Sequence, residues 1–163
     1  MILVVECKAD EALARAVGLT RRQVEHFLGK GRVCSRLADL RGATGMMDED
    51  PGMTAPSYFQ SLEPAASTER SVDLLIDKER DNRVVILCPR LEDWILDAAK
   101  KSGLQLTDFG FASDNGILLH AEINERLASL GKLVAALRKK KSERLLYLKS
   151  LLAQDKKRLK LSR

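Results

Sequence analysis

The hydrophobic residues of this chain follow two patterns up to residue 102. Runs of consecutive apolar residues, typical of strands buried on both faces of a sheet, occupy 1–7, 43–47, 72–76 and 84–88. Between them, apolar residues recur every three or four positions, the spacing of one helix face, at 10–17, 32–40 and 89–102. This alternation predicts an α/β fold with a largely parallel sheet flanked by helices.

The connections between these runs are rich in turn-forming residues. Residues 19–28 fit either a helix start or a second strand at 24–28, and Gly29-Lys30-Gly31 then indicates a turn. The segment 51–64, with three prolines and a glycine, is predicted as a loop. Asp81-Asn82 separates the last two strands, which are therefore expected to form a hairpin.

After residue 102 the pattern becomes helical throughout. We predict an irregular connector at 103–116, helices at 117–130 and 132–141 that are broken near Gly131, and a last helix from Ser142. The last helix carries a leucine stripe that should pack on the body of the protein or on another subunit: Leu145, Leu148, Leu152 and Leu159. The chain thus divides into an α/β domain at 1–102 and a helical extension at 103–163.

The net charge of +5 is unevenly distributed. Between Arg138 and Arg163 there are eleven Lys or Arg residues and two acids, whereas the remainder of the chain is mildly acidic. The basic residues that we expect to contact nucleic acid are Arg138, Lys139, Lys140 and Lys141, together with Lys156, Lys157, Arg158 and Lys160. The alternative is an ordinary solvated helix face.

Several function classes are disfavoured. Cys7, Cys34 and Cys88 are an odd number without paired spacing, so we expect free thiols and a cytoplasmic protein. We expect no secretory leader and no membrane span. Neither His26 nor His120 has the spacing of a zinc site, and no Gly-x-Ser-x-Gly elbow indicates a covalent triad.

Acidic residues follow two of the predicted strands. Glu6 ends the first run, and Asp48-Glu49-Asp50 ends the run at 43–47. Residues i and i+2 project to one side of a strand, so Asp48 and Asp50 can point to a common position, and Glu6 joins them if the two strands are neighbours. The carboxyl ends of such strands are where open α/β sheets place their sites, and Mg²⁺ or Mn²⁺ would offset the repulsion.

Two lysines near these acids have alternative interpretations. Lys8 either pairs with Glu6 or meets a phosphate. The turn at Gly29-Lys30-Gly31 is either an ordinary turn or a phosphate cradle in front of a helix N-terminus, with Lys30 as the phosphate contact. The acids themselves have a simpler interpretation as a solvated turn and a strand-end residue satisfied by a helix N-terminus.

A Glu that ends the first strand, a glycine-containing turn and an Asp-x-Asp that ends a later strand resemble the Toprim domain of topoisomerases, primases, RNA-maturation nucleases and OLD-family nucleases. The resemblance covers roughly residues 1–102. The stretch 89–96 is also similar to an acidic helix start in small Toprim-like proteins of the RloB type. Gly52 stands where topoisomerases carry a third aspartate, which favours the nuclease-like branch, and Cys7 stands where Gly is usual.

The resemblance implies a Mg²⁺-dependent (or Mn²⁺-dependent) phosphoryl-transfer enzyme acting on nucleic acid. It implies catalytic roles for Glu6 and Glu92 and metal binding by Asp48 and Asp50. One alternative is a non-catalytic Toprim-like subunit whose C-terminal helices form a homodimer or dock a partner such as an ATPase, as in defence systems. Another is a phosphoesterase that acts on small nucleotides.

Overall fold

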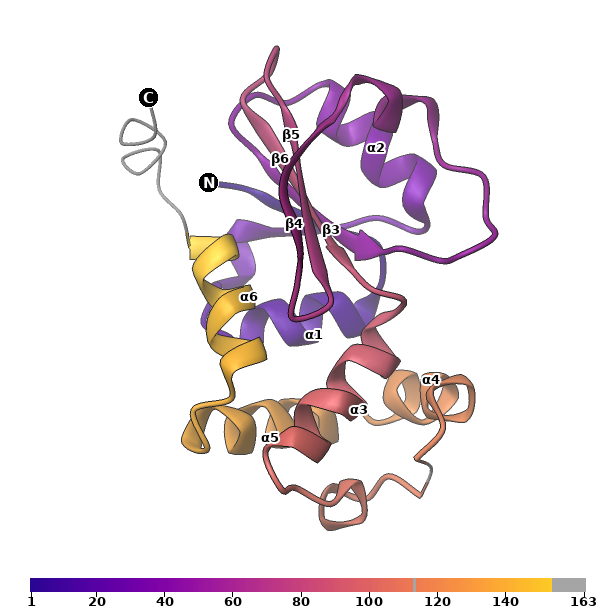
Figure 1. The fold of residues 1–163 in the computed structure, drawn as a ribbon, viewed down its shortest axis with the longest axis vertical. Coiled ribbons are helices and arrows are strands. Elements are labelled where there is room, and N and C mark those ends of the chain that lie inside the picture. Colours follow the sequence, from indigo (N-terminus) through magenta and orange to yellow (C-terminus); the bar gives the residue numbers. More distant parts are fainter. Residues whose placement is uncertain (113, 154–163) are drawn as a thin grey trace.

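The structure is a computed structural model that describes residues 1–112 and 114–153 (Figure 1). Its strands and helices, in chain order, are β1 (Leu3–Val5), α1 (Lys8–Ala16), η1 (Arg21–Gln23), β2 (Val24–His26), α2 (Lys30–Ala38), β3 (Thr44–Asp48), η2 (Ser57–Ser61), β4 (Glu63–Glu69), β5 (Val72–Asp77), β6 (Asn82–Leu87), α3 (Leu91–Lys101), η3 (Leu106–Phe109), α4 (Gly116–Glu125), α5 (Leu127–Lys139) and α6 (Glu143–Ala153). The fold is α/β, as the sequence predicted.

The sheet has the strand order β2-β1-β3-β6-β5-β4. The strands β2, β1, β3 and β6 are parallel, whereas β5 and β4 run antiparallel to their neighbours. Val5 lies opposite Met46, and Asp48 lies opposite Leu87. The carboxyl ends of β1, β3 and β6 therefore reach one edge of the sheet side by side, and the predicted hairpin of β5 and β6 is confirmed.

Alternate residues of the central strands pack into two hydrophobic cores, one on each face of the sheet. Leu3 and Val5 belong to the larger core with α1 and α3 to α6, whereas Val4 belongs to the smaller core beneath α2. Figure 1 shows α2 on one side of the sheet and α1, α3, α4, α5 and α6 on the opposite side. Both faces of the parallel strands are covered, which explains their continuous apolar runs.

The helices after residue 103 share the larger core with the α/β part. Leu130, Val134 and Leu137 of α5 are fully buried there, and α5 packs along α1. From the leucine stripe of the last helix, the residues Leu145, Leu148 and Leu152 are buried in the same core, so this stripe packs on the body of the protein. Leu159 and the basic residues Lys156, Lys157, Arg158 and Lys160 lie outside the described residues.

Two predicted boundaries are wrong. The break between α4 and α5 lies at Arg126, whose backbone leaves the helical region at φ −129° and ψ 51°, and Gly131 lies within α5. The end of the predicted loop at 51–64 belongs to β4, an edge strand with register shifts. Pro64 is compatible with an edge strand, because one side of such a strand makes no ladder hydrogen bonds.

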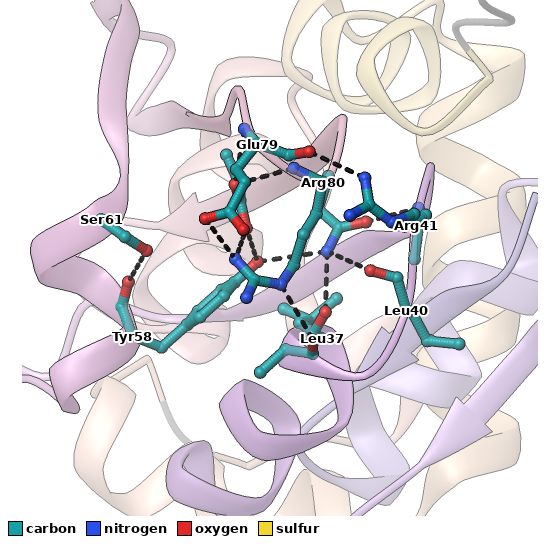
Figure 2. Close-up of polar contacts among 11 residues, drawn as sticks. Leu37, Leu40, Arg41, Tyr58, Ser61, Glu79 and Arg80 are labelled. Carbon is teal, nitrogen blue, oxygen red and sulfur yellow. Dashed lines mark hydrogen bonds and ion pairs between the residues drawn. The ribbon is translucent and has the colours of Figure 1, made fainter.

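A cluster of hydrogen-bonded polar residues lies at the edge of the sheet where β6 begins (Figure 2). Asn82 donates to the carbonyl oxygens of Leu37 (2.8 Å), in the last turn of α2, and of Leu40 (3.0 Å), just after that helix. Asp77 accepts a hydrogen bond from the Tyr58 hydroxyl (2.9 Å) and from the backbone of the turn between β5 and β6. The cluster joins α2, η2 and the hairpin at the edge opposite the ends of β1 and β3.

No helix in the described part of the chain is long and apolar enough to cross a membrane.

Candidate acidic site

Carboxylates from several elements meet near the ends of β1 and β3. Glu6 directly follows β1, Asp48 is the last residue of β3, and Asp50 lies two residues further on. Because β1 and β3 are neighbours, Glu6 and Asp48 lie at the ends of adjacent strands, and the backbone N–H of Asp48 contributes to the environment of the Glu6 carboxylate. Glu92, in the first turn of α3, contributes to the electrostatic environment of Asp48. The sequence predicted all four residues at this position.

Glu6 is a partly buried carboxylate with an unsatisfied oxygen. Burial raises its pKa above the ordinary value, while the nearby Lys30 charge and the backbone N–H groups of Lys30 and Asp48 act in the opposite direction. Its Oε2 atom is buried and has no hydrogen-bond partner among the described residues. A buried oxygen of this kind is rare in folded proteins and calls for a functional explanation.

Asp48 is held by the N-terminus of α3. Its Oδ1 atom accepts a hydrogen bond of 2.8 Å from the backbone N–H of Leu91. Burial, followed by the charges of Asp10 and Glu92, raises the pKa of Asp48 to about 9. In the absence of a cation, this carboxyl group therefore keeps its proton at neutral pH.

Lys30 supplies a positive charge to the site. Its Nζ atom lies 3.1 Å from Asp50 Oδ2 and donates to the carbonyl oxygen of Glu49 at 3.0 Å. Asp50 has a left-handed backbone with φ 51°, a conformation that Asp and Asn tolerate better than most residues. The structure thus places Lys30 on the acidic turn.

Asp10 is a site residue that the sequence interpretation missed. Its Oδ2 atom accepts from the backbone N–H of Cys7 (3.1 Å), and Cys7 Sγ accepts from the backbone N–H of Asp10 (3.4 Å), which caps α1. Asp10 is 2% exposed, and its Oδ1 atom has no partner among the described residues. Burial, with smaller contributions from Glu6 and Glu92, raises its pKa to about 7. The Cys7-x-x-Asp10 spacing was the available signal.

His120 is the second residue that was missed. Its Nδ1 atom lies 2.6 Å from Oε1 of Glu92, which is only 3% exposed, and Asn124 Nδ2 lies 3.3 Å from the other ring nitrogen. Gly116 allows α4 to approach α3 closely, because a Cβ atom there would lie 2.2 Å from Oδ1 of Asp93. No local sequence signal joins His120 to Glu92, since only the packing of α4 on α3 brings them together.

The remaining predicted residues lie elsewhere. Lys8 is the first residue of α1, is exposed, and forms no ion pair with any described residue. Arg138, Lys139, Lys140 and Lys141 lie at the end of α5. The structure therefore brings Glu6, Lys30, Asp48, Asp50 and Glu92 together and leaves the other basic residues outside this cluster.

The site can be tested for compatibility with a divalent metal. Within the described residues, no group of three or more His, Cys, Asp or Glu side chains is arranged to hold a metal ion. Mg²⁺, however, is commonly bound by one or two carboxylates, with water and phosphate oxygens as its other ligands. Glu6 and Asp10 each have a buried carboxylate oxygen without a partner among the described residues, and such oxygens are compatible with binding to a divalent cation.

A scan against protein-family models found no match, and searches among curated proteins and solved structures found no significant similarity.

Proposed function

We propose that the protein is a Mg²⁺-dependent (or Mn²⁺-dependent) phosphoryl-transfer enzyme, a nuclease-like Toprim protein that acts on nucleic acid in the cytoplasm. One observation carries the proposal: the buried Asp10 and the partly buried Glu6 and Asp48 lie near the ends of β1 and β3 with raised pKa values, and two of them have unpartnered oxygens. The three free cysteines agree with a reducing compartment.

The energetic cost of this cluster favours a functional role. A buried ionised carboxylate without a partner costs several kcal/mol, and the usual response is protonation. Apolar or amide side chains at Asp10 and Asp48 would avoid that cost. Lys30 is the cation that the structure places directly on the acidic turn, and its contacts are with Asp50 and Glu49. A bound divalent cation would offset the remaining repulsion.

The residues divide into distinct roles. Asp48 and Asp50 would hold the metal, which when bound would neutralise phosphate charge and lower the pKa of a water molecule. Glu6, with its raised pKa and free Oε2 atom, would exchange a proton with the attacking water or the leaving oxygen. Glu92 would keep His120 oriented at the rim of the site.

Metal binding is tested by isothermal titration of the full chain with Mn²⁺ and Mg²⁺. We expect saturable binding by the wild type and its loss in Asp48→Asn, which keeps an acceptor for the Leu91 N–H. Asp50→Asn should also lose binding, and it retains the tolerance for a left-handed backbone. Asp108→Asn, on the exposed turn η3, is the control and should bind like the wild type. Equal binding by all four proteins would refute the metal site.

Activity is tested with DNA, RNA and small nucleotides in the presence of Mn²⁺. We expect cleavage of a nucleic-acid polymer that is lost in Glu6→Gln although the protein still binds metal. Cleavage of small nucleotides alone would instead identify a phosphoesterase.

A second candidate is the non-catalytic interaction subunit. One observation favours it, because Ile117 and Leu118 of α4 are 67% and 63% exposed. The described part of the α6 leucine stripe is used within the chain, so docking of an ATPase would use another surface such as this one. Metal-independent binding to a partner, without cleavage of any nucleic acid, would support this function.

A further inference from the structure

A cationic cavity lies where the end of α5, the start of α6, the end of α3 and the tip of the β4–β5 hairpin meet. Its volume is about 340 Å³. Among the residues that line it, one is acidic, Glu143, and the basic ones are Arg70, Lys101, Lys140, Lys141 and Arg144. These come from four separate parts of the fold. Asp97 pairs with Lys101 and Arg144, and Glu143 pairs with Arg70, so Lys140 and Lys141 supply the charge that the described ion pairs leave over.

Arg144 is the fixed part of this cavity. It is only 8% exposed, its Nη1 atom donates to the carbonyl oxygen of Arg70, and its Nη2 atom pairs with Asp97. The Nε atom is buried and has no hydrogen-bond partner among the described residues. A buried guanidinium with an unused donor costs free energy, and an anion bound in the cavity would supply the acceptor.

The backbone adds further donors. α6 is an 11-residue helix, and its first turn, Glu143 to Leu145, has N–H groups without intrahelical acceptors. The helix dipole makes this end positive. Ser142, the residue before the helix, also lines the cavity. Free N–H groups combined with fixed arginine and mobile lysine side chains are the donor set that binds a phosphate group.

Two lysines that follow α5, Lys140 and Lys141, add further positive charge to the cavity. Neither Lys140 nor Lys141 forms an ion pair with a described residue. Lys141 follows Lys140, the C-cap of α5, and has a left-handed backbone with φ 54°, at a position that usually carries glycine. A glycine there would relax the backbone, so the lysine side chain is present despite its conformational cost.

We propose that this cavity binds a phosphate group. Phosphate binding itself does not depend on the proposed function, but the assignment of that phosphate to the backbone of a nucleic acid rests on it. The cavity would then hold the strand at a distance from the acidic site, because it lies at the C-terminal end of α3 whereas Asp48 contacts the N-terminal end of that helix.

Binding is tested by amide NMR titration of the full chain with inorganic phosphate. We expect saturable shifts of the Glu143, Arg144 and Leu145 amides. Lys140→Gln should weaken binding about ten-fold. Lys141→Gly should weaken it similarly while raising the melting temperature, so that its effect cannot come from misfolding. Lys132→Gln, on the same helix but outside the cavity, is the matched control and should bind like the wild type.

The source of the phosphate is tested with a 5′-phosphorylated oligonucleotide. Binding that is tighter than that of inorganic phosphate, falls with salt and weakens in Lys141→Gly indicates a nucleic-acid backbone. Equal affinity for both probes indicates a free phosphate or a nucleotide. The cavity proposal is overturned if phosphate leaves the Glu143–Leu145 amides unshifted, or if Lys132→Gln weakens binding as much as Lys141→Gly. Loss of Mn²⁺ binding in Asp48→Asn tests the proposed function separately.

Discussion

At the scale of single residues, the acidic site reduces the stability of the fold. Asp10 ionises near pH 4 in an unfolded chain, but burial raises its pKa to about 7 in the folded protein. Between these values the folded state holds a proton that the unfolded state has released, so the contribution of Asp10 to stability falls as the pH rises through this range. Above pH 7 the folded protein carries a buried charge.

Asp10→Asn should therefore be a stabilising change in the metal-free protein. An asparagine Oδ1 atom can still accept from the backbone N–H of Cys7, so the cap of α1 is kept. We expect the free energy of unfolding to rise by on the order of 2 kcal/mol at pH 8 and to change little at pH 4. Urea unfolding in EDTA at both pH values measures this, and a loss of stability at pH 8 would show that the fold needs the charge.

The contact of Glu92 with His120 gives a second prediction at this scale. His120→Ala removes the 2.6 Å contact and leaves a nearly buried carboxylate without that partner. We expect the free energy of unfolding to fall by about 1 kcal/mol, and the loss should largely disappear when Glu92→Gln is already present. A double-mutant cycle measures the coupling. Additive effects of the two changes would contradict the pairing.

At the scale of helices and strands, the hydrophobic pattern was most informative where burial is continuous. β1, β3, β5 and β6 coincide with apolar runs because both of their faces, or one whole face, are buried. β4 was missed because its side chains, such as Glu63 and Pro64, are those of an edge strand. Edge strands depend on pairing with a neighbour more than on their own composition.

The residues of the acidic site also differ in how far the sequence predicts them. Glu6, Asp48 and Asp50 could be predicted because each follows a strand, and strand order fixes their neighbours. The Cys7-x-x-Asp10 spacing indicates a helix cap, but it does not show that Asp10 is buried beside these acids. His120 could not be predicted, because its contact with Glu92 depends on how α4 packs on α3. A local sequence pattern does not specify which helix faces meet.

Two helical glycines, one packed against α3 and one in open space, should respond oppositely to substitution by alanine. Gly116→Ala would place a Cβ atom 2.2 Å from Asp93 Oδ1, so α4 must shift or Asp93 must leave its 2.8 Å contact with Arg90. We expect a loss of about 1–3 kcal/mol in the free energy of unfolding. Gly131→Ala, in the interior of α5 with no atom within 4 Å, should instead stabilise by up to about 1 kcal/mol. Thermal unfolding measures both, and equal effects would contradict the difference in packing.

At the scale of the whole molecule, the two edges of the sheet have opposite characters. The edge where β6 begins carries the satisfied cluster of Asp77, Tyr58 and Asn82 (Figure 2). Burial acts to raise the pKa of Asp77, but hydrogen bonds from Arg80 and Tyr58 and the Arg80 charge lower it overall. The other edge carries carboxyl groups whose pKa values are raised. Carboxyl groups with lowered and with raised pKa values therefore lie at opposite edges of the same sheet.

The carboxyl groups at these two edges determine how the stability of the fold should depend on pH. Asp77 stabilises the protein above pH 4, and this contribution is lost as the pH falls below its ordinary pKa. Asp10 and Asp48 act in the opposite direction, because their contributions fall as the pH rises from about 4 towards their pKa values of about 7 and about 9. In EDTA we expect the urea midpoint to be highest near pH 5 and to fall by pH 8.

Divalent metal should prevent the fall of the urea midpoint between pH 5 and pH 8. At the proposed site Mn²⁺ would bind the ionised carboxylates of the folded protein, so its stabilising effect should grow with pH and restore the midpoint at pH 8. In Asp48→Asn the curves with EDTA and with Mn²⁺ should coincide, because one proposed ligand is missing. Asp108→Asn should retain the difference between the two curves. A wild-type midpoint that rises from pH 5 to pH 8 in EDTA would contradict the assignment of the raised pKa values to this edge of the sheet.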